Sequence, residues 1–197
     1  MPAARRIPGL ILALAGAWLA GYALWLYWPD FEAMALALTF SGNFVAGLVF
    51  LAGGVFQLVT ARPAPRFLYF DAIVVLTLVF VICVIFMDSL TTFDVLFVLH
   101  VVNPLLALGL WLGLVDHSVS RFVPTVLSGA VFPLVYFNLV ILTGAGGYDF
   151  VDVDQQGIGG VLLFALGCLA ALLATGALLL ALNRLLHRPT PRESTVM

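Results

Sequence analysis

The chain has no lysine, few charged residues of any kind and only two cysteines among its 197 residues. Charged residues make up 9% of the sequence, whereas soluble domains carry roughly a quarter. Hydrophobic residues reach 63% and the mean hydropathy is +1.17. This composition excludes an ordinary soluble domain and predicts an integral membrane protein, for which we expect no nucleic-acid partner.

The scarce cysteines and histidines also argue against a metal or cofactor. Cys83 and Cys168 fall inside apolar runs. By the helical rise, their depths in the membrane differ from each other by roughly 8 Å, so we expect no disulfide. Three histidines at unrelated depths do not form a zinc site, and a bis-histidine haem would need a second histidine facing His100. We therefore predict that the protein uses no cofactor and no metal.

Six apolar stretches are each long enough to cross about 30 Å of hydrocarbon. Short connections favour one all-α domain over residues 1–187, a single bundle of six transmembrane helices, followed by a short disordered cytoplasmic tail over 188–197. The first stretch could instead be a cleaved signal sequence, although its interfacial aromatic residues favour a span. The spans are expected near residues 7–28, 34–59, 67–87, 95–115, 123–143 and 158–183.

The arginines predict the orientation. All eight lie at the start, in alternate connections or at the end of the chain, so the positive-inside rule places both termini in the cytoplasm. The opposite side carries acidic residues and no basic ones. The lack of lysine, with abundant alanine, leucine, valine and arginine, suggests a bacterial protein and hence a multi-pass protein of the plasma membrane.

Polar side chains of three predicted spans fall at one depth, near the outer end of the bundle. Each lies about five residues, roughly 8 Å, below that end or one helical turn further in. Such groups are costly to expose to lipid, so we expect them to turn inward and form a small polar pocket. The members are Thr39, Asn43, His100, Asn103 and Asn138.

His100 is the most informative of these residues, because an ionisable side chain inside a membrane indicates a functional site. Pro104, four residues later, has no N–H to donate to the His100 carbonyl, so a bend is expected there. Pro133 is expected to kink the fifth span.

Other polar residues are expected to be structural or solvated. Asp71 is predicted to pair with Arg66 or another arginine at the interface. We expect His117, in a polar connection, and His187, in the basic tail, to be solvated and without function.

A hydroxyl beside an imidazole is the minimum for acyl transfer, and Thr39 with His100 fits that pairing. Helical N–H groups are already bonded, so side-chain amides would have to stabilise the oxyanion; the candidates are Asn43, Asn103 and Asn138. An apolar ester could enter from the bilayer. A channel or transporter, a lipid-binding protein without chemistry and a scaffold remain as alternatives.

The longest outer connection, residues 144–157, contains Tyr148 and Phe150. It could cover the pocket as a lid, with these two residues at the rim, or be an acidic solvated loop with interfacial anchors.

The chain resembles the androgen-induced and androgen-dependent membrane hydrolases and their bacterial relatives, a family with six spans. The resemblance lies in Leu38-Thr39-Phe40 with Asn43, in His100 with Pro104, and in Tyr148-Asp149-Phe150. It covers most of the chain in layout.

The resemblance implies an ester hydrolase for fatty acid esters of hydroxy fatty acids, with Thr39 as nucleophile and His100 as base. It implies an acyl-threonine intermediate that water hydrolyses. Asp149 stands where relatives often have proline, and the connections are shorter than in the animal proteins. The animal substrates carry a carboxylate, for which this chain has no basic residue on the predicted outer side.

Overall fold

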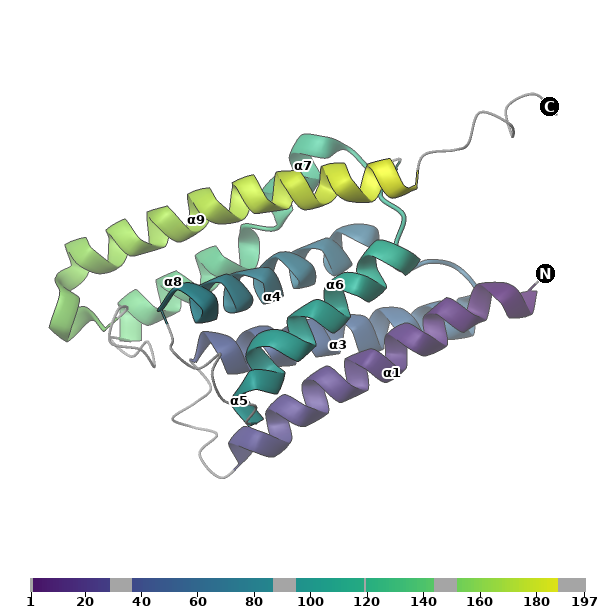
Figure 1. Ribbon diagram of the computed structural model, residues 1–197, viewed down its shortest axis with the longest axis horizontal. Coiled ribbons are helices and arrows are strands. Elements are labelled where there is room, and N and C mark those ends of the chain that lie inside the picture. Colours follow the sequence, from purple (N-terminus) through teal and green to yellow (C-terminus); the bar gives the residue numbers. More distant parts are fainter. Residues whose placement is uncertain (1, 29–36, 87–94, 119, 144–151, 188–197) are drawn as a thin grey trace.

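The computed structural model describes residues 2–28, 37–86, 95–118, 120–143 and 152–187. Throughout these ranges the regular structure is helical, without a strand, and six segments are long and apolar enough to cross a membrane. Figure 1 shows them as one elongated bundle. The elements are α1 (Pro2–Tyr27), α3 (Leu38–Thr60), α4 (Arg66–Phe86), α5 (Val95–Phe97), the π-helix η3 (Val98–Val102), α6 (Asn103–Leu114), α7 (Phe122–Ser128), α8 (Val131–Thr143) and α9 (Val153–Leu186).

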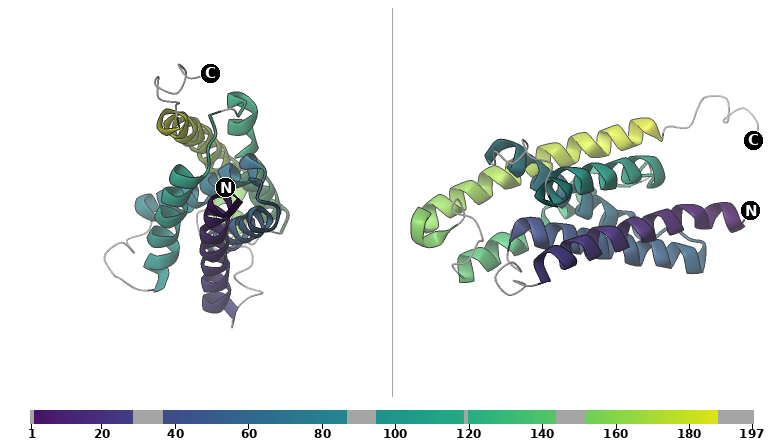
Figure 2. Two further views of the ribbon diagram at one scale, coloured as in Figure 1. Left: turned by 90° about the vertical axis from the view of Figure 1, so that its right-hand side faces the viewer. Right: turned by 60° about the horizontal axis from the view of Figure 1, so that its bottom comes forward.

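α1 packs mainly on α3, and glycines set how closely the two helices approach (Figure 2). A Cβ placed on Gly16 would lie 2.1 Å from the backbone nitrogen of Leu51, and one on Gly47 would lie 2.3 Å from that of Ala20. Neither position has room for a side chain, because backbone atoms fill the space. Small residues therefore allow close backbone contact between helices, as is common in membranes.

α4 lies at the centre of the bundle and contacts α3, α6, α8 and α9. Its window of highest hydropathy is also the most buried of the six. Phe70, Ile73 and Val74 are each at most 1% exposed. A helix that is apolar on all sides belongs in a bundle's interior, and the sequence of α4 has that character.

The fourth span changes its helical geometry just before Pro104, where the sequence predicted a bend. Residues 98–102 form a turn of π-helix, in which the N–H of Asn103 bonds to the carbonyl of Val98, five residues earlier. Because Pro104 has no N–H to give to His100, the regular α-helical bonding stops here. The wider turn contains His100.

The fifth span is also interrupted. α7 ends at Ser128 and α8 begins at Val131, with a turn at Gly129 and Ala130. Pro133 lacks the N–H that would bond to Gly129, so the α-helical ladder cannot continue through this turn. The predicted kink is therefore a break that divides the span into two helices.

The sixth span begins earlier than predicted. Residues 153–156 are already helical, and the Asp152 side chain accepts hydrogen bonds from the N–H groups of Asp154 and Gln155. Gly157 then adopts φ 68°, which interrupts the helical geometry inside α9. The predicted start of this span at 158 is the residue directly after that kink.

His117 is not the solvated residue that was predicted. It is 0% exposed, and its ring lies 3.1 Å from both the Trp111 Nε1 and the Ser120 hydroxyl. Its backbone N–H donates to the Asn183 side chain at 2.9 Å. Burial, together with the positive charge of Arg66, lowers the pKa of His117 to about 4, so the ring is neutral at pH 7. This cluster joins the connection before α7 to α9.

Two further expectations at this end of the bundle were wrong. His187 is partly buried, and its Nε2 lies 2.9 Å from the Leu112 carbonyl oxygen. The Asp71 carboxylate accepts a hydrogen bond from the Ser128 hydroxyl at 2.7 Å, and no arginine of the described chain pairs with it. Asp71 therefore links α4 to α7, and its partner is a neutral hydroxyl.

Candidate active site

Thr39 and His100 face each other across the interface between α3 and the π-helical turn. The distance from Thr39 Oγ1 to His100 Nε2 is 2.9 Å. Thr39 is 4% exposed and His100 is 3% exposed, so the contact is shielded from the surroundings. The two side chains are 61 residues apart in sequence and have the geometry of a hydroxyl with its general base.

The other ring nitrogen fixes the tautomer of His100. Nδ1 lies 2.8 Å from the carbonyl oxygen of Leu96, four residues earlier. Since a carbonyl can only accept a hydrogen bond, Nδ1 carries the proton and donates it. In the neutral ring Nε2 is then the acceptor, and the Thr39 hydroxyl donates to it. This is the tautomer that can remove the hydroxyl proton.

Asn43 holds the helices around this pair together. Its side-chain nitrogen donates to the carbonyl of Thr39 at 2.8 Å and to that of Leu99 at 3.2 Å. The first carbonyl belongs to Thr39 itself, and the second belongs to Leu99, the residue before His100. Both N–H bonds of this amide therefore reach backbone acceptors. The arrangement fits a positioning residue and disagrees with the expectation that Asn43 donates to an oxyanion.

Asn103 extends the network to α1. It donates to the Asn43 side-chain oxygen at 2.9 Å, and its own oxygen accepts from Trp18 Nε1 at 3.1 Å. Asn43 and Asn103 are both 0% exposed. Sequence reasoning missed Trp18, because the first span appeared to serve only packing. The available signal was an indole N–H in an apolar helix, a donor that needs a polar partner when buried.

The position of Thr39 offers another source of oxyanion stabilisation. α3 begins at Leu38, so Thr39 lies in the first helical turn, closer to the helix end than its predicted depth. The positive end of the helix dipole lies at that turn and stabilises negative charge nearby. The dipole at the start of α3 can therefore act on negative charge near the Thr39 hydroxyl.

Asn138 does not join this cluster. It is exposed on α8, and its side chain donates to the Leu134 carbonyl of its own helix at 2.7 Å. It lines an apolar groove between α8 and α9. The structure therefore brings together four of the five predicted polar residues. Tyr148 and Phe150, expected at the pocket rim, lie outside the described residues.

An aromatic cluster lies at the start of α3, next to Thr39 in sequence. The ring of Phe40 stacks on Phe44 with centroids 5.5 Å apart and meets Tyr27 edge-on at the same distance. Leu99 and Ala23 belong to the same cluster. The Thr39 hydroxyl and the His100 imidazole are both buried, so a ligand can reach them only when neighbouring side chains move.

The described residues show no group suited to a metal. No cluster of three or more histidine, cysteine or acidic side chains with ligand geometry occurs among them. Cys83 and Cys168 are buried and free.

Comparison of the chain with protein-family models, with curated proteins and with solved structures found no match.

Proposed function

We propose that this protein is a membrane-embedded hydrolase that cleaves lipid esters with Thr39 as nucleophile and His100 as general base. The observation that carries the proposal is the 2.9 Å contact between Oγ1 and Nε2, with Nδ1 held by the Leu96 carbonyl. A threonine that bonds only to its own helix would serve structure, and Thr39 instead meets an imidazole from another span.

In the first half of the reaction, His100 Nε2 takes the hydroxyl proton as Thr39 Oγ1 bonds to the ester carbonyl carbon. The carbonyl oxygen becomes an oxyanion close to the start of α3, where the helix dipole stabilises it. When the intermediate collapses, the imidazolium returns the proton to the leaving alkoxide oxygen. An alcohol departs and the acyl group remains on Thr39.

In the second half, water replaces the alcohol. His100 removes a proton from the water as its oxygen attacks the acyl carbon, and the imidazolium then protonates Thr39 Oγ1. The products are a carboxylic acid and the original hydroxyl. Asn43 and Asn103 keep α3 and the π-helical turn in register during both halves.

The substrate class follows from the surroundings of the pair. Six apolar spans and an aromatic cluster at the start of α3 favour a substrate with long hydrocarbon chains that enters from the bilayer. The resemblance to the androgen-induced and androgen-dependent membrane hydrolases favours fatty acid esters of hydroxy fatty acids. The protein then acts in a bacterial plasma membrane, with both termini cytoplasmic and the pair near the outer surface.

The test is hydrolysis of a fluorogenic fatty-acyl ester by the purified protein in detergent. We expect Thr39→Ala and His100→Ala to lower the rate at least 10²-fold, the lower range for loss of a general base. Thr77→Ala is the matched control, because Thr77 bonds only to the Ile73 carbonyl of its own helix at 2.8 Å. His187→Gln is the corresponding control for histidine.

Equal turnover by the wild type and both site variants would exclude the hydrolase. The same pocket would then fit a protein that binds or transports a small lipid without chemistry. A loss of activity in Thr77→Ala as large as in Thr39→Ala would also contradict the assignment, since it would show that any threonine substitution disturbs the bundle.

A further inference from the structure

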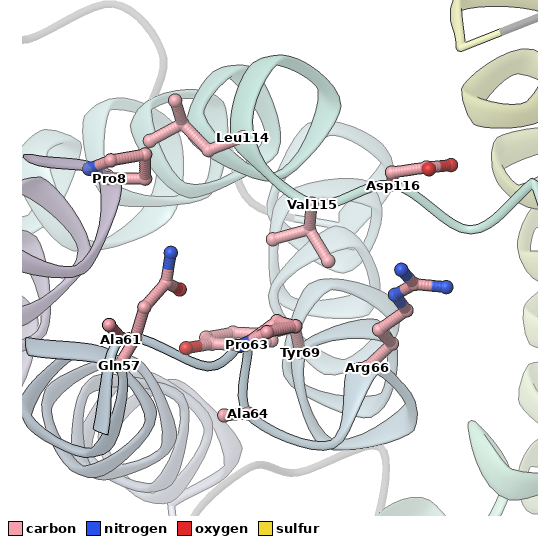
Figure 3. A pocket seen from close by; sticks show the side chains of 10 residues that line it. All are labelled: Pro8, Gln57, Ala61, Pro63, Ala64, Arg66, Tyr69, Leu114, Val115 and Asp116. Atoms are coloured by element: carbon pink, nitrogen blue, oxygen red, sulfur yellow. The ribbon is translucent and has the colours of Figure 1, made fainter. Parts of the chain in front are cut away.

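A second site lies at the opposite end of the bundle from Thr39. A cavity of about 360 Å³ is formed where α3 ends and α4 begins, with the first part of α1 and the end of α6 as its other walls. Most of its wall is apolar. Its polar side chains are Gln57, Arg66, Tyr69 and Asp116, from three different segments (Figure 3). None of them takes part in the proposed reaction.

The Tyr69 hydroxyl is the first sign of a ligand. Tyr69 is 2% exposed, and its oxygen has no hydrogen-bond partner. A buried hydroxyl is normally paired, because leaving it unpaired forfeits the bonds that water would make. A Cβ on Gly53 would lie 2.2 Å from this oxygen, so glycine leaves the space that the hydroxyl occupies. A polar occupant of the cavity would supply the missing partner.

Two side chains of opposite charge, Arg66 and Asp116, lie at the same edge of the cavity. Figure 3 shows Arg66 and Asp116 on one side and Gln57 with the Tyr69 hydroxyl on the other. Among the described residues no hydrogen bond joins Arg66 to Asp116, and the Asp116 carboxylate accepts from the Ser118 N–H at 2.7 Å. The edge therefore offers one guanidinium and one carboxylate side by side.

The acidic group is ionised at neutral pH. Burial acts to raise the pKa of Asp116, but hydrogen bonds from Ser118 and the charge of Arg66 outweigh it, so the pKa is lowered. The Asp116 carboxylate would repel a ligand that carries only negative charge. The Arg66 guanidinium would repel a ligand that carries only positive charge. A ligand with both charges satisfies both residues.

We propose that this cavity binds the headgroup of a zwitterionic phospholipid. Arg66 pairs with the phosphate and Asp116 with the ammonium, while Tyr69 and Gln57 bond to the oxygens nearer the glycerol. The cavity lies at the ends of the spans, the depth at which headgroups are found. The lipid holds the ends of α1, α4 and α6 together at a site separate from Thr39.

The experiment is native mass spectrometry of the full-length protein in detergent with equal amounts of phosphatidylethanolamine and phosphatidylglycerol. We expect the wild type to bind the zwitterionic lipid at least fivefold more tightly. Arg66→Gln should weaken that binding at least tenfold, through loss of a charge-assisted contact with the phosphate. Asp116→Asn should abolish the preference over the anionic lipid. Arg62→Gln is the matched control, since Arg62 is exposed and does not line the cavity.

Equal affinity for both lipids in the wild type, or equal losses in Arg62→Gln and Arg66→Gln, would overturn the proposal. Competition with soluble phosphoethanolamine shows whether the site binds a membrane lipid or a free small molecule. If it competes at the same concentration as the lipid, the site takes a free zwitterion and the lipid assignment is wrong.

Tyr69→Phe gives a second measurement that does not depend on charge. Without lipid, its melting temperature should rise, because the variant removes an unpaired buried hydroxyl. With saturating phosphatidylethanolamine the gain should disappear, since the wild-type hydroxyl is then paired. A gain of the same size with and without lipid would contradict the assignment of Tyr69 to the ligand.

Discussion

Asn103 donates a hydrogen bond to Asn43 across two spans, at 2.9 Å between Nδ2 and Oδ1. Both residues are fully buried, and together they connect Trp18 of α1 to the backbone on either side of the Thr39 and His100 contact. The pair of amides therefore determines how α3 and the fourth span meet. Through these backbone bonds it positions the residues that carry the hydroxyl and the imidazole.

A double-mutant cycle tests this connection. Asn43→Ala and Asn103→Ala should each destabilise the protein, and their coupling energy should be about 0.6 kcal/mol, with about 1.7 kcal/mol as the upper range for membrane hydrogen bonds. Unfolding in mixed detergent measures the four proteins. Strictly additive effects would show that the two amides act independently.

The contact between α1 and α3 should tolerate no side chain at Gly47. Gly47→Ala places a Cβ 2.3 Å from the Ala20 backbone nitrogen, which we expect to cost about 1–3 kcal/mol or more through overpacking. Separation of the helices also weakens the bond from Trp18 to Asn103. Gly21→Ala is the control, because nothing lies within 4 Å of its added Cβ. Equal melting temperatures for the two variants would contradict the close approach.

Acidification should weaken the end of the bundle that contains His117. The pKa of this residue is about 4 in the folded protein, below its ordinary value near 6.5, so between these pH values the unfolded chain binds more protons. The stability from neutral His117 is present above pH 6.5 and is lost as the pH falls toward 4. The melting temperature of the wild type should therefore fall more steeply over this range than that of His117→Gln. The same pH dependence of the melting temperature in both proteins would contradict the assigned role of neutral His117.

The spans and the main polar pair could be predicted because they depend on local chemistry. Hydropathy locates apolar helices, and counting residues from a helix end gives depth. His100 stood out because an imidazole in an apolar run needs a partner. Pro104 indicated a change of helical geometry at the same place, and the structure has a π-helical turn there.

Depth alone does not tell which way a side chain points. Asn138 is at a suitable depth, yet it bonds to its own helix and lines a groove between α8 and α9. His117 looked solvated because its neighbours in sequence are polar, while the amide that binds its backbone comes from Asn183, 66 residues later. The packing of α9 against the connection before α7 decides that burial, and no local pattern shows it.

Labelling with a fluorophosphonate tests the central claim most directly. The probe reacts with an activated hydroxyl, and peptide mass spectrometry locates the adduct. We expect the adduct on Thr39 in the wild type, none in Thr39→Ala and a much slower reaction in His100→Ala, where the base is missing. An adduct on another residue, or unchanged labelling of Thr39→Ala, would contradict the proposed nucleophile.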